Sequence, residues 1–323
     1  MDFFQEADQL GESSKVLFNK KLNHFTAITN QTLEDLINNP AAASHTLSQQ
    51  TQIAQTSSNR HMYYSAVTAY LKHTTKGSQV EESIKQQWLT IQKNNWEERR
   101  QQALNNEPTQ NQIIVATTVK WQDVLTIRDQ LKAGTLEKLL LSLYSYVPPV
   151  RADYFDVEIN PTTKATKEKS NYIILHKTDE TKSYIVLHDF KTAHKYTEIK
   201  HQLPKPLFDE LHKSLKEKPR SHVFVMPSNA TKPYDRGGFS KWANKVLTTL
   251  FKVPMTLTSL RHLFISTIDF NNTRGVELEK IGNSMGHSIS MQKGYQWLPQ
   301  DLDQAEDLAQ TAPLSQTQEL ALS

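Results

Sequence analysis

Two arginines, a lysine, a histidine and a late tyrosine are the residues of this 323-residue chain whose types and order could do chemistry. Arg261 lies in TLTSLRHLFI, where apolar residues recur at helical spacing. His287 follows Gly286, at which a second helical pattern over residues 276–285 ends. Tyr295 is the last tyrosine of the chain and stands eight residues further on. An arginine, a histidine and then a tyrosine in this order suggest covalent chemistry on a phosphodiester.

The physical reason for this interpretation is charge. Attack on a phosphodiester builds negative charge on the non-bridging oxygens, and an always-protonated guanidinium can bind two of them. A tyrosine phenol suits the nucleophile's role because its phosphate ester keeps the bond energy needed to rejoin the strands. Without a metal, a second guanidinium and a general acid are wanted. Arg151, which follows Pro148–Pro149, and Lys191, at the tip of a predicted strand–turn–strand, are the candidates.

With these residues in place, the sequence resembles the tyrosine recombinase (phage-integrase-like) superfamily over roughly residues 118–297. The family pattern is arginine, lysine, His-x-x-Arg, histidine or tryptophan, and tyrosine. It is matched here by Arg151, Lys191, Arg261, His287 and Tyr295, with Thr258 at the usual histidine position. The strings PPVRADY, DFKTAHKY, SLRHLF and MGHS are most similar to integrases of eukaryotic mobile elements, large DNA viruses and virophages.

The resemblance implies a DNA-cleaving and DNA-joining enzyme, a site-specific recombinase or integrase that works through a 3′-phosphotyrosine. Tyr295 is then the nucleophile, Arg151, Arg261 and His287 hold the phosphate, and Lys191 protonates the leaving 5′ oxygen. Thr258 offers one neutral hydrogen bond, weaker than a charge-assisted bond from histidinium. The resemblance also implies no metal, ATP or other cofactor, and a homotetramer on two DNA duplexes. The spacing from His287 to Tyr295 is one residue shorter than in many bacterial members.

Two alternatives stay open. A type IB topoisomerase or a telomere resolvase would use the same residues without exchanging strands between two duplexes. A non-catalytic DNA-binding protein descended from a recombinase would bind DNA in a salt-dependent way without ever becoming covalently attached. The threonine at position 258 is the feature that favours this second alternative.

Composition narrows the class of protein. With no cysteine, disulfides and thiolate zinc sites are excluded, and no HExxH-like cluster or phosphate-binding glycine loop occurs. The chain has no apolar run of membrane-spanning length and no secretory start, so we expect an intracellular protein, located where its target DNA is: host nucleus, viral factory or cytoplasm. The net charge is only +3, but residues 111–297 hold 27 Lys/Arg against 18 Asp/Glu. That excess suits a phosphate backbone.

Periodicity predicts two domains and two terminal segments. We expect an N-terminal tail (1–12), an all-α core-binding domain that clamps DNA (13–110, ending in a polar linker at 105–112), a catalytic domain (111–297) and an acidic tail (298–323). The tail is consistent with either a helix exchanged between protomers or disorder. The catalytic domain is predicted to be α+β, mostly helical with a small antiparallel three-stranded sheet. Arg60, Lys72 and Lys195 are candidate DNA-binding residues, although residues 1–110 could also be a helical domain without a DNA role.

Overall fold

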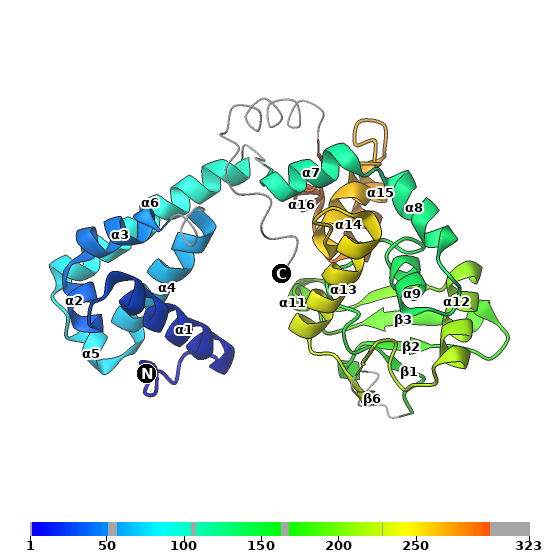
Figure 1. The fold of residues 1–323 in the computed structure, drawn as a ribbon, viewed down its shortest axis with the longest axis horizontal. Coiled ribbons are helices and arrows are strands. Elements are labelled where there is room, and N and C mark those ends of the chain that lie inside the picture. Colours follow the sequence, from blue (N-terminus) through cyan, green and yellow to red (C-terminus); the bar gives the residue numbers. More distant parts are fainter. Residues whose placement is uncertain (1, 51–56, 105–107, 163–167, 228, 298–323) are drawn as a thin grey trace. The chain divides into compact units, whose positions relative to one another are not determined.

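The computed structural model describes residues 2–50, 57–104, 108–162, 168–227 and 229–297 (Figure 1). The chain divides into two compact units between Glu107 and Pro108. The polar stretch 105–112 is not wholly a linker, because helix α7 (Gln110–Thr118) begins inside it, capped by the Thr109 side chain. The acidic tail and its expected exchange helix lie outside the described residues. Within those residues, no helix has the length and apolar content to cross a bilayer.

The first unit is all-α, and its helices pack around aromatic side chains. Phe25, Tyr63 and Trp88 are at most 1% exposed, and the Trp88 indole donates a hydrogen bond to the Ile37 carbonyl. Residues 2–11, expected to be a tail, belong to this core, because burial of the fully enclosed Phe4 ring fixes them there. The helices of the unit are α1 (Glu12–Thr29), α2 (Leu33–Asn38), α3 (Pro40–Gln49), α4 (Ser57–His73), α5 (Thr75–Ser78) and α6 (Glu82–Leu104).

The second unit is α+β and mostly helical, as the sequence predicts. Its main sheet has the order β1-β2-β3-β4, and β2, β3 and β4 are antiparallel neighbours. The sheet has four strands rather than three, because a short strand β1 pairs in parallel with β2. A strand of two residues is too short to show an alternating pattern, which is why its direction could not be predicted. The strands are β1 (Glu158–Ile159), β2 (Tyr172–Ile174), β3 (Tyr184–Leu187) and β4 (Ile199–Gln202), with β5 (Val225–Met226) and β6 (Asn229–Pro233) in a separate pair.

Helices surround this sheet, and their ends follow the capping residues (Figure 1). Helix α13 (Arg236–Phe251) begins directly after Asp235, because the Asp235 side chain accepts a hydrogen bond from the Gly238 N–H at 2.7 Å. Helix α15 ends at Gly286 as predicted, with the glycine at φ 67°. The remaining helices are α8 (Trp121–Gln130), α9 (Leu136–Leu143), α11 (Ala193–Tyr196), α12 (Lys205–Glu217), α14 (Leu257–Ile265), α15 (Gly275–Met285) and α16 (Ile289–Lys293).

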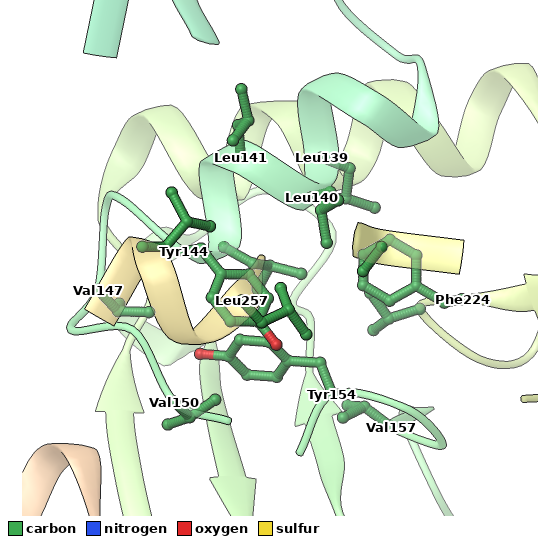
Figure 2. Close-up of a cluster of buried hydrophobic side chains, with 14 of the residues drawn as sticks. Leu139, Leu140, Leu141, Tyr144, Val147, Val150, Tyr154, Val157, Phe224 and Leu257 are labelled. Atoms are coloured by element: carbon green, nitrogen blue, oxygen red, sulfur yellow. The ribbon is translucent and has the colours of Figure 1, made fainter. Parts of the chain in front are cut away.

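The core under α9 fixes the chain on both sides of Arg151. Figure 2 shows Tyr144 and Tyr154 packed together below the leucines of α9, with Val150 beside them. The two tyrosine rings meet edge to face with centroids 5.1 Å apart, and Val150 is fully buried. The Tyr144 hydroxyl donates a hydrogen bond to the Arg151 carbonyl. The backbone of Arg151 is therefore held by packing, so its side chain starts from a fixed point.

Candidate active site

Arg261 is a buried cation at the centre of the second unit. It lies on α14, whose apolar face packs into the core, and its side chain is fully buried. Its Nη1 donates hydrogen bonds to the carbonyls of Pro149 at 2.8 Å and Met285 at 3.4 Å. Among the described residues, no carboxylate forms an ion pair with it, and Nε has no hydrogen-bond partner. Because a buried charge without a counter-ion is costly, this guanidinium is suited to receive an anion.

The neighbouring histidine is held in one tautomer by that arginine. Nη2 of Arg261 lies 2.8 Å from Nδ1 of His287. Since a guanidinium can only donate, Nδ1 must accept, and the neutral ring carries its proton on Nε2. Burial, together with the charges of Arg261 and Arg151, lowers the pKa of His287 to about 3. Nε2 is also buried and has no partner among the described residues. His287 is therefore a neutral N–H donor.

Tyr295 lies against both groups. Its ring stacks on that of His287, with centroids 5.6 Å apart and an interplanar angle of 29°. Cζ of Arg261 is 5.0 Å from the centre of the tyrosine ring. Burial raises the pKa of the Tyr295 phenol, but the charges of Arg261 and Arg151, and side-chain hydrogen bonding to both, bring it below its ordinary value. The site thus stabilises the phenolate form of Tyr295 relative to that of a tyrosine in water.

An open cavity of about 650 Å³ continues from this cluster. Arg151 connects the cavity with the cluster, because it lines the cavity and its charge also lowers the pKa of Tyr295. Lys191, exposed on the connection between β3 and β4, and Thr258, exposed in the first turn of α14, line the same cavity. The structure therefore places Arg151, Arg261, His287 and Tyr295 in one cluster, and joins Lys191 and Thr258 to it along the cavity wall.

Two polar residues that the sequence analysis missed hold the loops of the site. Asn171, fully buried at the start of β2, donates from Nδ2 to the carbonyls of Asp153 and Asp189 at 2.9 Å each. Its Oδ1 accepts from the backbone N–H groups of His188 and Asp189 at 2.8 Å. The buried Asp153 carboxylate accepts from the Arg151 N–H at 3.1 Å. These bonds fix the loops that carry Arg151 and Lys191.

A further cation, Arg236, lies at the cavity and was also missed. It forms ion pairs with Asp153 and Asp189, and it lines the cavity beside Arg151. The sequence carried one usable signal for this network, because Asp153 and Asp189 each stand two residues from a predicted catalytic cation. Nothing in the pattern around Asn171 or Arg236 pointed to them.

The three residues predicted to bind DNA differ in their surroundings. In the first unit, Nη2 of Arg60 donates hydrogen bonds to both carboxylate oxygens of Glu98 at 2.7 Å, so the charge of Arg60 is already paired. Lys72 is exposed on α4. In the second unit, Lys195 is exposed, with its ammonium 5.4 Å from the centre of the Tyr196 ring. Within the described part of the chain, no group of three or more His, Asp or Glu side chains is arranged to hold a metal ion.

The second unit is thus an α+β unit that holds a cluster of Arg261, His287 and Tyr295. No protein-family model matches the chain, and no curated protein matches it in sequence. Solved structures that are similar to it include the following two. The crystal structure of XerA recombinase has a TM-score of 0.41 and 10% identity, over 95% of this chain and 94% of that one. The Tn1549 transposon integrase in complex with transposon right-end DNA has a TM-score of 0.37 and 13% identity, over 92% and 99%. With both TM-scores below 0.5, function has to be argued from the side chains.

Proposed function

We propose that this chain cuts and rejoins DNA as a tyrosine recombinase or integrase, with Tyr295 as the nucleophile. The observation that carries the proposal is the position of Tyr295, whose ring stacks on His287 and lies 5.0 Å from Cζ of Arg261. In that position the charges of Arg261 and Arg151 lower the pKa of the phenol despite its burial. A tyrosine that attacks a phosphodiester needs both a lowered pKa and cations for the phosphate oxygens.

In the proposed reaction, the Tyr295 oxygen forms a bond to phosphorus and the bond from phosphorus to the 5′ oxygen breaks. The phenol proton leaves to solvent, and Lys191 gives a proton to the departing 5′ oxygen. Arg151 and Arg261 bind the non-bridging oxygens, and the His287 Nε2–H donates to one of them. A 5′-hydroxyl then attacks the phosphotyrosine in reverse, and the ester bond supplies the energy for rejoining.

Double-stranded DNA is the substrate that the charge distribution favours. Residues 111–297 carry 27 Lys/Arg against 18 Asp/Glu, while residues 298–323 carry no Lys/Arg and 5 Asp/Glu. Strand exchange between two duplexes needs four such sites, so we propose a tetramer on DNA. On the motif strings around the site residues, we further propose an integrase of a mobile element or virus that acts inside the cell where its target DNA lies.

The test is formation of a covalent protein–DNA complex. Purified protein is mixed in EDTA with nicked duplexes made from the genomic DNA that flanks its coding sequence, and the reaction is quenched with SDS. We expect a covalent band and a free 5′-hydroxyl end with the wild type and with Tyr184→Phe, a control on β3. We expect none with Tyr295→Phe.

Other outcomes distinguish the alternatives. Salt-dependent but non-covalent binding that Tyr295→Phe leaves unchanged would contradict the proposal and indicate a DNA-binding protein without catalysis. Covalent cleavage with relaxation of supercoiled DNA, but no exchange between two-site substrates, would indicate a topoisomerase or resolvase activity.

A further inference from the structure

His262 makes three contacts to the segment that carries Tyr295 and one to α7. In one of them the His262 and Tyr295 rings meet, with centroids 4.8 Å apart. It follows Arg261 on α14 and is only 8% exposed, in keeping with the core position that its direction on the helix predicts. Its Nδ1 lies 2.8 Å from the Tyr295 carbonyl oxygen. Its ring stacks on Trp297, with centroids 4.7 Å apart and planes 6° from parallel. On the other side, Nε2 lies 3.2 Å from Nε2 of Gln112.

These contacts require a single protonation state of the ring. A carbonyl oxygen can only accept, so Nδ1 carries the proton, and Nε2 accepts from the Gln112 amide. Burial lowers the pKa of His262 to about 4; the bond to the Tyr295 carbonyl opposes this and the charge of Arg261 adds to it. Near neutral pH the imidazole is thus a neutral ring with one donor aimed at the backbone of Tyr295.

The segment that carries the nucleophile is attached to α14 at two points. Besides the His262 contact, the Trp297 N–H donates to Oγ of Ser266 at 3.0 Å. Before Tyr295, helix α16 has only five residues, and Lys293 and Gly294 are exposed. Because Arg261 lies on the same helix as His262, one rigid element sets both the phosphate-binding guanidinium and the backbone of the nucleophile.

We propose that His262 is a positioning residue that holds Tyr295 beside Arg261 within the same chain, a role that rests on the function proposed for Tyr295. His262 does not touch the reacting atoms. It acts through the Tyr295 carbonyl and through packing against the Tyr295 ring, so its loss displaces the phenol without removing any catalytic group. A displacement of about 1 Å from the attack geometry can lower a reaction rate by about 100-fold.

The experiment uses matched variants of the full chain. His262→Phe keeps an aromatic ring on Trp297 but removes the donor to the Tyr295 carbonyl. His262→Asn places an amide N–H near the position of Nδ1 and removes the stacked ring. Ser266→Ala removes the second attachment point and changes little else, so it serves if His262→Phe fails to fold.

Two readouts separate the proposal from the function on which it rests. Hydrogen exchange of residues 289–297 is measured without DNA, and the covalent cleavage rate is measured at saturating DNA. For His262→Phe we expect exchange in 289–297 to rise by about tenfold, the factor for one hydrogen bond, and cleavage to fall by about 10- to 100-fold with an unchanged Kd for DNA. His262→Asn should restore both values to within a few-fold, and Ser266→Ala should raise exchange in the same peptide.

The proposal is overturned if exchange in 289–297 stays at the wild-type value in both His262→Phe and Ser266→Ala, or rises equally throughout the second unit. It is also overturned if His262→Phe cleaves DNA as fast as the wild type. If the wild type shows no covalent chemistry but His262→Phe still loosens residues 289–297 alone, the proposed function fails while the attachment of this segment by His262 stands.

Discussion

Replacement of His287 by asparagine tests whether this residue acts as a neutral hydrogen-bond donor or as an acid. In the structure its Nδ1 accepts from Arg261, and its pKa is lowered to about 3. At pH 7 only about one ring in 10⁴ is then protonated. Asparagine can keep an acceptor for Arg261 through its Oδ1, but it has no donor at the position of Nε2. The substitution therefore removes the donor and leaves the arginine paired.

The expected effect follows from the charge that builds on the phosphate. One donor to a developing oxyanion contributes about 10²–10³-fold to the rate, and a neutral donor belongs at the lower end. We expect His287→Asn to lower the covalent cleavage rate by about 100-fold. His287→Gln, whose amide nitrogen reaches the position of Nε2, should retain more activity, although it leaves Arg261 without its acceptor.

The assay measures the rate of covalent cleavage between pH 5 and 8 at DNA concentrations well below saturation. At such concentrations the pH dependence of the rate reports the protonation of the free protein. No inflection from His287 is expected in this range, since its pKa lies near 3. An acid limb near pH 6.5 that vanishes in His287→Asn would refute the assignment of a neutral donor. A limb near pH 6 that survives in the variant would instead fit Asp156, whose pKa is raised to about 6 by burial and by Asp189, against the charge of Arg236.

Three further predictions concern the surroundings of the site. Thr258→His should raise cleavage several-fold, measured on the same duplexes, because the exposed position lines the cavity and a histidine there adds a stronger donor; an equal or slower rate would argue against room for the ring. Asn171→Ala should lower the free energy of unfolding by at least about 3 kcal/mol in urea titrations, since four main-chain bonds are lost from a buried position; a loss below 1 kcal/mol would contradict this role. The free energy of unfolding should be greatest above pH 6.5 and fall below it. The reason is that His262 and His287 have pKa values of about 4 and 3 in the folded protein, below the ordinary 6.5. As the pH falls, they therefore bind protons in the unfolded state before they do so in the folded state. Each histidine contributes a slope of about 1.4 kcal/mol per pH unit, so the pH dependence of urea unfolding should be shallower in His287→Asn; equal slopes would count against the lowered pKa.

Local patterns were enough for most of the elements that carry the site. The apolar spacing around Arg261 and the glycine at position 286 predicted α14 and α15, because helical periodicity and a left-handed cap are properties of neighbouring residues. The α+β class followed from the same patterns. The parallel pairing of the two-residue strand β1 with β2 was not predicted, since a short strand has no period that shows its direction. The cap at Asp235 was not predicted either, because a cap depends on the geometry of one turn.

The contacts between the site residues could not be predicted from the sequence. Asn171 stands far along the chain from Asp153, and its four bonds to neighbouring loops leave no periodic trace in the sequence. Arg60 was expected to be available to phosphates, yet Glu98, on another helix of the same unit, already pairs with it. The bond from His262 to the Tyr295 carbonyl joins residues 33 positions apart, so no local pattern could predict it.

What the sequence determined by itself is the set of residue types and their order along the chain: two arginines, a lysine, a histidine and a late tyrosine, placed on or beside predicted elements. Tertiary structure alone decided that Arg261 is buried without a carboxylate partner among the described residues, that His287 is a neutral donor, and that the charges of two guanidiniums act on Tyr295. The physical reason is that burial and charge act through space. The pKa of a side chain depends on neighbours that the fold brings together, whatever their distance in sequence.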